Sequence, residues 1–138
     1  GNSEILAMDA EKLANDLEFD VTVNGMDEIT LSDIQDNGNV LIVCSTWGDG
    51  EQPDNAIDLY ESVEGSDDAS MSGVGFAVLA LGDTAFDLFC EAGIQWDNIL
   101  QEKGGNRISQ RIDCDVDYED DAEAWIEDTL NLFKKTWE

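Results

Sequence analysis

The sequence predicts an α/β protein of three layers, in which a doubly wound parallel sheet is covered by helices on both faces. Two continuous apolar segments, 39–45 and 73–83, are typical of strands that are buried on both faces. Segments with helical spacing of apolar residues alternate with them along the chain, for example 3–17 and 118–135. Because strands that alternate with helices form parallel sheets, this order predicts the doubly wound class.

The chain up to residue 38 is expected to form a helix, a strand and a turn. Residues 3–17 carry apolar side chains at helical spacing, which predicts a helix. In 19–24 apolar and polar residues alternate, which predicts a half-buried strand. Residues 29–34 are expected to form a short turn.

The rest of the chain continues the alternation. Helices are predicted for 54–63 and 87–102 because their apolar residues follow helical spacing, and 64–73 is expected to be a surface loop. Residues 107–115 are predicted to form the last strand. The final helix, 118–135, begins with acids and ends with lysines, an order that the helix dipole favours.

Composition limits the classes of function. The 138 residues suffice for one domain, and we expect residues 1–138 to form a single one. The 33 acids and 6 bases give a net charge of −27, so nucleic acids and anionic membranes would repel the chain. No apolar run is long enough to span a bilayer, and the first residues lack the features of a signal peptide. We therefore expect a cytoplasmic protein, and we expect it to be a monomer.

The three cysteines, Cys44, Cys90 and Cys114, are predicted to be free, buried thiols. They are widely spaced and the chain has no histidine, so they do not fit the patterns of zinc or iron–sulfur sites. Free thiols of this kind are typical of a reducing compartment.

Each of the two loops that follow the apolar strands carries an aromatic residue, Trp47 in STWGDGEQPD and Phe86 in LGDTAFDLFC. Ligands of parallel sheets bind outside the carboxyl ends of the strands, which is where both loops begin. A tryptophan set among glycines and acids is costly to expose, so we expect a ligand to cover it. Two aromatics from neighbouring strand ends would hold a flat ring between them.

These two loops resemble the flavin-holding loops of short-chain flavodoxins and of the flavodoxin-like FMN domain of diflavin reductases, such as the sulfite reductase flavoprotein. The opening GNSE resembles the second half of the family's phosphate loop, and RISQRIDCDVDYEDDAEAWIED resembles its last strand and helix. The resemblance covers nearly the whole chain. It implies a flavodoxin-like sheet of strand order 2-1-3-4-5, whose first strand and half of the phosphate loop would precede Gly1.

The resemblance also implies FMN as the cofactor. Its phosphate would lie on backbone N–H groups at the start of the first helix. GNSE alone is more typical of an ordinary helix cap, and it is the two downstream loops that favour the phosphate site. Trp47 and Phe86 would stack on the two faces of the ring. At the position of Phe86 the family usually has tyrosine. Gly48 would let its peptide rotate, so that its carbonyl accepts a hydrogen bond from the reduced ring. The other implied cofactor contacts are Gly1, Asn2, Ser3, Ser45, Thr46, Asp49, Gly50, Leu81, Gly82, Asp83, Phe89 and Cys90.

Two functions remain open at this point. One is a free-standing flavodoxin, a carrier without catalytic residues that moves single electrons between redox partner proteins; the other is the FMN domain of a diflavin reductase. A receiver domain is disfavoured because it needs an aspartate where Ser45 and Thr46 stand. A flavin-dependent quinone reductase is disfavoured because the sequence shows no nicotinamide-binding motif.

Both aromatic loops are acidic, and residues 45–54 and 82–91 contain no Lys or Arg. Carboxylates near the flavin would disfavour its negatively charged reduced form. They would also attract a reductase and an acceptor with basic docking faces. The large net charge suggests a further hypothesis, adaptation to a salty cytoplasm, in which screening would relieve the self-repulsion of the chain.

Overall fold

A parallel sheet forms the middle layer of the structure, a computed structural model that describes residues 2–18, 23–46, 52, 54–82, 90–115 and 117–136. Strand β1 (Asn39–Ser45) pairs with β2 (Gly75–Leu81) along its whole length, from Asn39 opposite Gly75 to Ser45 opposite Leu81. On its other side β2 pairs with two short strands, β3 (Asn106–Arg107) and β4 (Ile112–Cys114). All these pairs are parallel.

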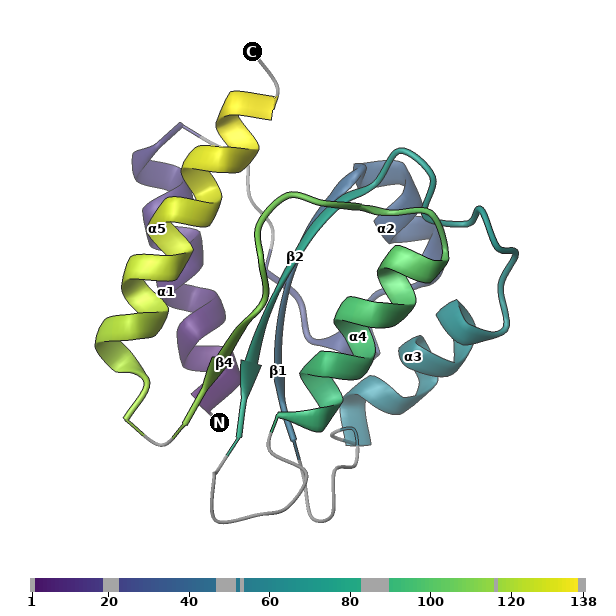
Figure 1. Ribbon diagram of the computed structural model, residues 1–138, viewed down its shortest axis with the longest axis horizontal. Helices are drawn as coiled ribbons and strands as arrows, with labels where there is room; N and C mark the ends of the chain where they lie inside the picture. Colours follow the sequence, from purple (N-terminus) through teal and green to yellow (C-terminus); the bar gives the residue numbers. More distant parts are fainter. Residues whose placement is uncertain are drawn as a thin grey trace.

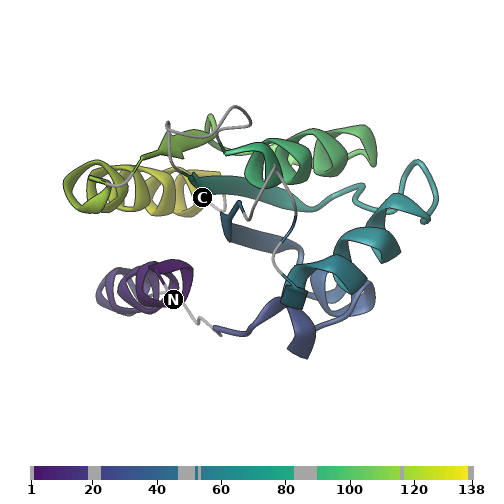
Figure 2. The same ribbon diagram turned by 90° about the horizontal axis from the view of Figure 1, so that it is seen from below.

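Helices cover both faces of this sheet (Figures 1 and 2). On one face α1 (Asn2–Asp16) lies beside α5 (Glu119–Thr136). On the other face lie α2 (Leu31–Asn37), α3 (Ile57–Glu64) and α4 (Glu91–Glu102). Two single-turn 3-10 helices, η1 (Met26–Glu28) and η2 (Asp54–Ala56), precede α2 and α3. The three layers confirm the predicted doubly wound class.

Two apolar clusters hold the layers together, and β2 contributes to both. Phe76 and Val78 point into the cluster under α2, α3 and α4, where Trp96 is also completely buried. Leu79 and Leu81 point to the other face, into the cluster under α1 and α5. Side chains of a strand alternate between its two faces, so a strand covered on both sides is apolar throughout.

β1 is less buried than the sequence predicts. Only Ile42 and Cys44 of this strand are buried, whereas Val40, Leu41 and Val43 are half-buried. Within the described residues no strand pairs with the second edge of β1, so β1 lacks the cover that β2 receives from both neighbours.

The predicted strand at 19–24 cannot be placed. Residues 19–22 lie outside the described residues, and residues 23 and 24 belong to no strand. The strand order 2-1-3-4-5 therefore stays a prediction. The observed order, β1-β2 followed by β3 and β4, is that of three successive parallel positions.

The prediction of a mere turn at 29–34 is wrong, because α2 begins at Leu31. Thr30 caps this helix: its Oγ1 accepts a hydrogen bond from the Asp33 N–H at 3.3 Å, and Asp33 Oδ2 accepts one from the Thr30 N–H at 2.9 Å. This capping box satisfies two backbone donors at the start of the helix. Gly38 ends the helix with a φ of 80°, a conformation that glycine adopts at low cost.

The prediction of one continuous strand at 107–115 is also wrong. Arg107 lies opposite Phe76 and Ile112 lies opposite Leu79, so more residues separate the two pairs on this segment than on β2. The extra residues form a bulge between β3 and β4. As a result, Arg107 and Arg111 both reach the carboxylate of Asp97 on α4.

Two other boundaries differ from the sequence prediction. α4 begins at Glu91, after Cys90 in the left-handed conformation with a φ of 57°; residues 87–89 lie outside the described part of the chain. The stretch 64–73 consists mainly of turns, as predicted, but its Met71 is fully buried and belongs to the apolar cluster under α2, α3 and α4.

Candidate functional site

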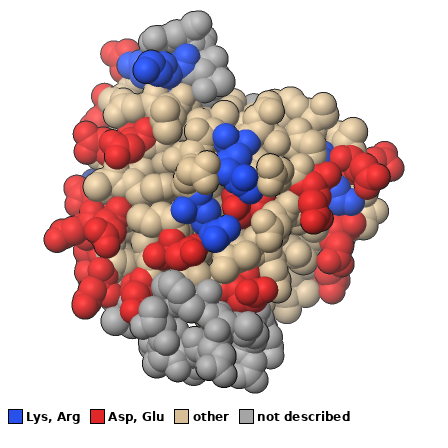
Figure 3. Space-filling model, viewed as in Figure 1, with Lys and Arg blue, Asp and Glu red and all other residues tan. Residues whose placement is uncertain are grey.

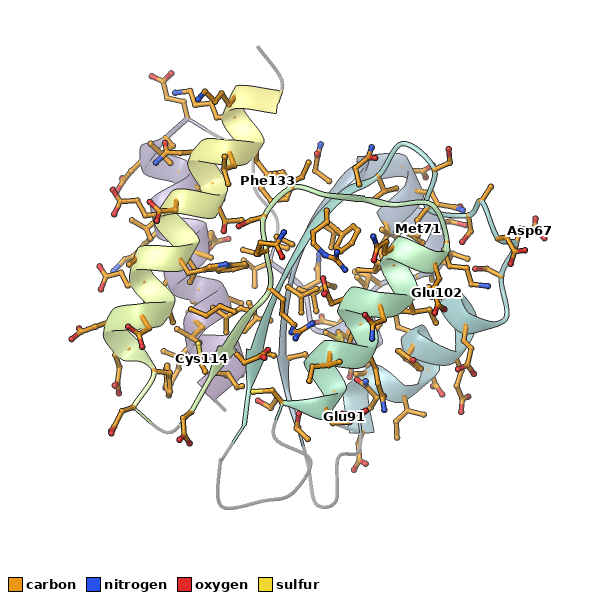
Figure 4. The ribbon with its side chains drawn as sticks, in the orientation of Figure 1. Asp67, Met71, Glu91, Glu102, Cys114 and Phe133 are labelled. Atoms are coloured by element: carbon orange, nitrogen blue, oxygen red, sulfur yellow. The ribbon has the colours of Figure 1, made fainter. Side chains whose placement is uncertain are left out.

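The candidate site is the edge of the sheet at which the parallel strands end. Ser45 and Leu81 are paired, so the loops that leave β1 and β2 start side by side. The first residues of α1, α4 and α5 lie at the same edge (Figure 1). Figure 4 shows Glu91 and Cys114 there, with Met71 and Phe133 toward the opposite end. The structure thus brings the described candidates to one edge; these are Asn2, Ser3, Ser45, Thr46, Leu81, Gly82 and Cys90.

The other predicted contacts lie outside the described residues. They are Gly1, Trp47, Gly48, Asp49, Gly50, Asp83, Phe86 and Phe89. The structure does describe the residues that flank each aromatic loop, which are Thr46 and Gln52 for the first loop and Gly82 and Cys90 for the second.

The two ends of the second loop touch each other. A Cβ at Gly82 would lie 2.7 Å from the backbone nitrogen of Cys90, closer than side-chain carbons approach any atom. Glycine at this position is therefore required by packing. The Gly82 N–H donates to the Cys114 carbonyl at 2.9 Å, which extends the sheet beyond the end of β4. The two described residues that flank 83–89 are therefore in contact.

The first loop starts from Thr46, which is bonded on two sides. Its N–H donates to the Leu81 carbonyl at 3.0 Å, and its Oγ1 accepts a hydrogen bond from the Ala92 N–H at 3.0 Å. Ala92 lies in the first turn of α4, where backbone N–H groups lack partners within the helix. Thr46 satisfies one of them, and a hydroxyl group that accepts a hydrogen bond can also donate one.

The cysteine thiols near the edge are chemically quiet. Burial raises the pKa of Cys44 to about 12. Burial, with a smaller contribution from Asp113, raises the pKa of Cys90 to about 12, and burial raises that of Cys114 to about 11. All three are free and buried, as predicted. Because the thiolate is the reactive form, the raised pKa values disfavour a nucleophilic role for these side chains at neutral pH.

Sequence reasoning missed Gln52. Its amide contacts α4 through Ala92, Gln95 and Trp96, so it belongs to the support of the site. No periodicity or charge pattern marks this residue, because its partners lie far along the chain.

A separate shallow hollow on α5 is lined by Asp128, Asn131, Leu132, Lys134 and Lys135. It lies toward the end of α5 that is away from this edge, so it is not part of the site.

The edge is strongly acidic. Among the described residues of its segments 2–4, 45–46, 54–56, 90–92 and 114–121, none is Lys or Arg. The acids there are Glu4, Asp54, Glu91, Asp115, Asp117, Glu119, Asp120 and Asp121. The basic side chains visible in Figure 3 lie elsewhere, with Arg107 and Arg111 paired to carboxylates.

Among the described residues, no helix is both long and apolar enough to cross a membrane. The described His, Cys, Asp and Glu residues include no group of three or more that could hold a metal ion.

Comparison with known proteins decides the family, because residues 1–125 match the family described as Flavodoxin. The chain belongs to the flavodoxin family. It is 42% identical over 130 residues to the sulfite reductase [NADPH] flavoprotein alpha-component of Bacillus subtilis. That match covers 94% of this chain and 22% of the relative, so the chain spans about a fifth of its length.

Solved flavodoxins share the fold. The Streptococcus pneumonia TIGR4 flavodoxin superimposes with a TM-score of 0.88 at 26% identity, covering 99% of this chain and 92% of the other. Oxidised flavodoxin 2 from Bacillus cereus gives a TM-score of 0.84 at 26% identity, with the same coverage of both chains. Family membership confirms the predicted fold class and the predicted class of function, FMN-dependent electron transfer.

Proposed function

We propose that residues 1–138 form one domain that binds FMN at the carboxyl edge of the sheet and exchanges single electrons with partner proteins. One observation carries this proposal. The two loops that hold the predicted stacking residues, Trp47 and Phe86, begin at neighbouring strand ends. The residue after the first loop, Gln52, bonds to Ala92 at the start of α4, and the second loop is followed directly by α4. A flat ring between the two loops would then be held from both faces.

The described residues fit such a cofactor. The 15-residue helix α1 has its N-terminus at this edge, where backbone N–H groups that have no acceptor within the helix, together with the helix dipole, favour a phosphate. Gly82 and Cys90 bring two backbone segments into contact where the pyrimidine side of the ring is expected. The protonated thiols add no competing chemistry. Bound FMN supplies the one-electron chemistry, and the chain binds it, orients it and shields it from water.

The acidic edge is expected to lower the reduction potential of the bound FMN. Each carboxylate near the ring opposes the negative charge that reduction adds, so the cluster lowers the reduction potential. Salt weakens this effect, since the Debye length is about 8 Å at physiological ionic strength.

The test of FMN binding is titration of the apoprotein, followed by flavin fluorescence, with wild type and Trp47→Ala. We expect the wild type to bind FMN and Trp47→Ala to bind it at least about tenfold more weakly, because one ring face loses its stacking partner and its cover. Trp47→Phe should retain most of the affinity. Trp125→Ala is the control, because Trp125 lies on α5 and its Nε1 donates to the Gln110 carbonyl. Equal affinity in wild type and Trp47→Ala would refute the stacking assignment.

A second function has its own support: the chain is the FMN domain of a longer reductase. The match to one fifth of a sulfite reductase flavoprotein favours it. The reading frame on both sides of the 138 residues distinguishes this from a free-standing carrier. In either case the 138 residues themselves should receive electrons from a partner, and NADPH alone should leave the bound FMN oxidised.

We further infer a cytoplasmic monomer whose redox partners dock through basic faces. The free, buried thiols support the location, since reducing compartments preserve them. The acidic edge supports the charge of the partners.

Electron transfer to a basic acceptor should depend steeply on salt. The probe is cytochrome c, mixed with the dithionite-reduced holoprotein in a stopped-flow instrument. Between low salt and about 0.5 M sodium chloride we expect the second-order rate to fall at least about tenfold, because screening removes the steering of opposite charges. A rate that does not change with salt would contradict an electrostatic docking edge.

A further inference from the structure

The side chain of Gln52 is held by three N–H···O hydrogen bonds and a thiol contact. Its Nε2 donates to the Ala92 carbonyl at 3.0 Å and to Gln95 Oε1 at 3.1 Å. Its Oε1 accepts from Trp96 Nε1 at 2.9 Å and from Cys44 Sγ at 3.6 Å. A primary amide has two donor hydrogens and two acceptor lone pairs. Both donors and one lone pair are engaged by N–H···O bonds, while the single Cys44 S–H is shared with the Ser45 carbonyl at 3.5 Å. The three N–H···O bonds specify both the position and the orientation of the Gln52 amide.

Trp96 makes the position of Gln52 costly to change. Its indole is completely buried, and a buried indole N–H without an acceptor loses its bond to water with no replacement. Gln52 Oε1 is the acceptor that this N–H has in the structure. The ring itself is held in place by Tyr60, which meets it edge-on with 5.2 Å between centroids and 85° between planes. Gln52 Oε1 must therefore lie beside the indole N–H in order to accept its hydrogen bond.

Ala92 connects both ends of the first aromatic loop to α4. Its N–H donates to Thr46 Oγ1, just before residues 47–51, and its carbonyl accepts from Gln52 Nε2, just after them. The second aromatic loop, 83–89, leads directly to Cys90 and the same helical turn. One turn of α4 is thus the common attachment of the two loops.

We propose that Gln52 is a positioning residue, which ties the end of the first aromatic loop to α4, close to Cys90, where the second aromatic loop ends. This inference rests on the proposed FMN function. Gln52 acts through the loop, so its loss should change how closely the ring is held and how well water is excluded from it. Both FMN affinity and the two one-electron reduction potentials should respond.

The experiment compares Gln52→Leu and Gln52→Glu with the wild type as FMN-loaded proteins. Leucine keeps the volume but leaves the Trp96 N–H without its acceptor. Glutamate keeps that acceptor but replaces the two donors with an oxygen facing the Ala92 carbonyl and Gln95 Oε1. We expect each variant to bind FMN at least about fivefold more weakly, with a measurable change in the separation of the two one-electron potentials.

Gln35→Leu is the matched control. Gln35 Nε2 donates to the Ser70 carbonyl at 2.8 Å and so also ties a helix to a loop, but it does not contact the first turn of α4. It should lose stability without any change in potentials. Wild-type potentials and affinity in both Gln52 variants would overturn the inference, as would equal shifts in Gln35→Leu. Failure of the wild-type apoprotein to bind FMN would instead overturn the proposed function. If Gln52→Leu does not fold, Gln52→Glu decides.

Discussion

Asp97→Ala should unfold at a markedly lower urea concentration than the wild type, with a loss of roughly 3 kcal/mol in the free energy of unfolding. Asp97 is only 3% exposed, yet it is charged. Its Oδ1 accepts from Arg107 Nε at 2.9 Å, and its Oδ2 accepts from Arg107 Nη2 at 3.0 Å and from Arg111 Nη1 at 2.9 Å. Alanine would leave two partly buried guanidinium groups without this carboxylate. The loss lies at the lower end of the range for buried pairs, because both arginines retain some contact with water.

Asp113→Ala is the control for this prediction. Asp113 also pairs with Arg111, with 2.7 Å between Oδ1 and Nε, but its side chain is 32% exposed. An exposed pair contributes little, so we expect a loss below about 1 kcal/mol. A similar loss in the two variants would show that burial of Asp97 is not what gives its pairs their importance. The FMN affinity of folded Asp97→Ala should stay within about twofold of the wild type.

This cluster is also notable for its use of charge. The chain has 6 basic residues and 33 acidic ones, and the cluster takes two of the six. Arg107 additionally lies over the ring of Phe76, with 5.8 Å from its guanidinium carbon to the ring centroid. Arg107 and Arg111 thus lie between α4 and the last strands, and not at the acidic edge where partners are expected to dock.

The sequence predicts those parts of the fold whose burial repeats along the chain. β2 is apolar at every position because both of its faces are covered, and α1 and α5 show helical spacing because each buries one face. The position of the two aromatic loops follows from the rule that ligands bind at the carboxyl ends of parallel strands. These features need no knowledge of contacts between distant residues.

The missed features depend on local hydrogen bonds or on distant partners. The helix α2 could have been found, because Thr30 and Asp33 form the spacing of a capping box. The bulge between β3 and β4 could not, because alternation of apolar residues does not reveal which residue of β2 each one faces. Gln52 could not either, because its partners on α4 are about forty residues away in the chain.

Gly93→Ala should have an effect comparable to that of Asp97→Ala, and it should also reach the site. A Cβ at Gly93 would lie 2.9 Å from the Cα of Ala80 and closer still to its Cβ, and Ala80 is completely buried near the carboxyl end of β2. Neither backbone can yield without moving a whole element, so the added methyl group must push α4 away from the sheet. We expect a loss of about 3 kcal/mol or more in the free energy of unfolding, at the upper end for overpacked cores. Gly65→Ala is the control, since a Cβ there would meet only the Glu61 carbonyl oxygen at 3.4 Å.

The consequence for function separates this variant from Asp97→Ala. Gly93 follows Ala92, whose backbone is bonded to both ends of the first aromatic loop, so a displaced α4 carries that attachment with it. At an equal loss of stability, folded Gly93→Ala should bind FMN at least about fivefold more weakly than folded Asp97→Ala. The comparison is made by titrating both apoproteins with FMN, without urea and at a temperature well below both melting transitions. If the two variants bind FMN equally well, the first turn of α4 does not position the loops, and the close approach of Gly93 to Ala80 serves stability alone.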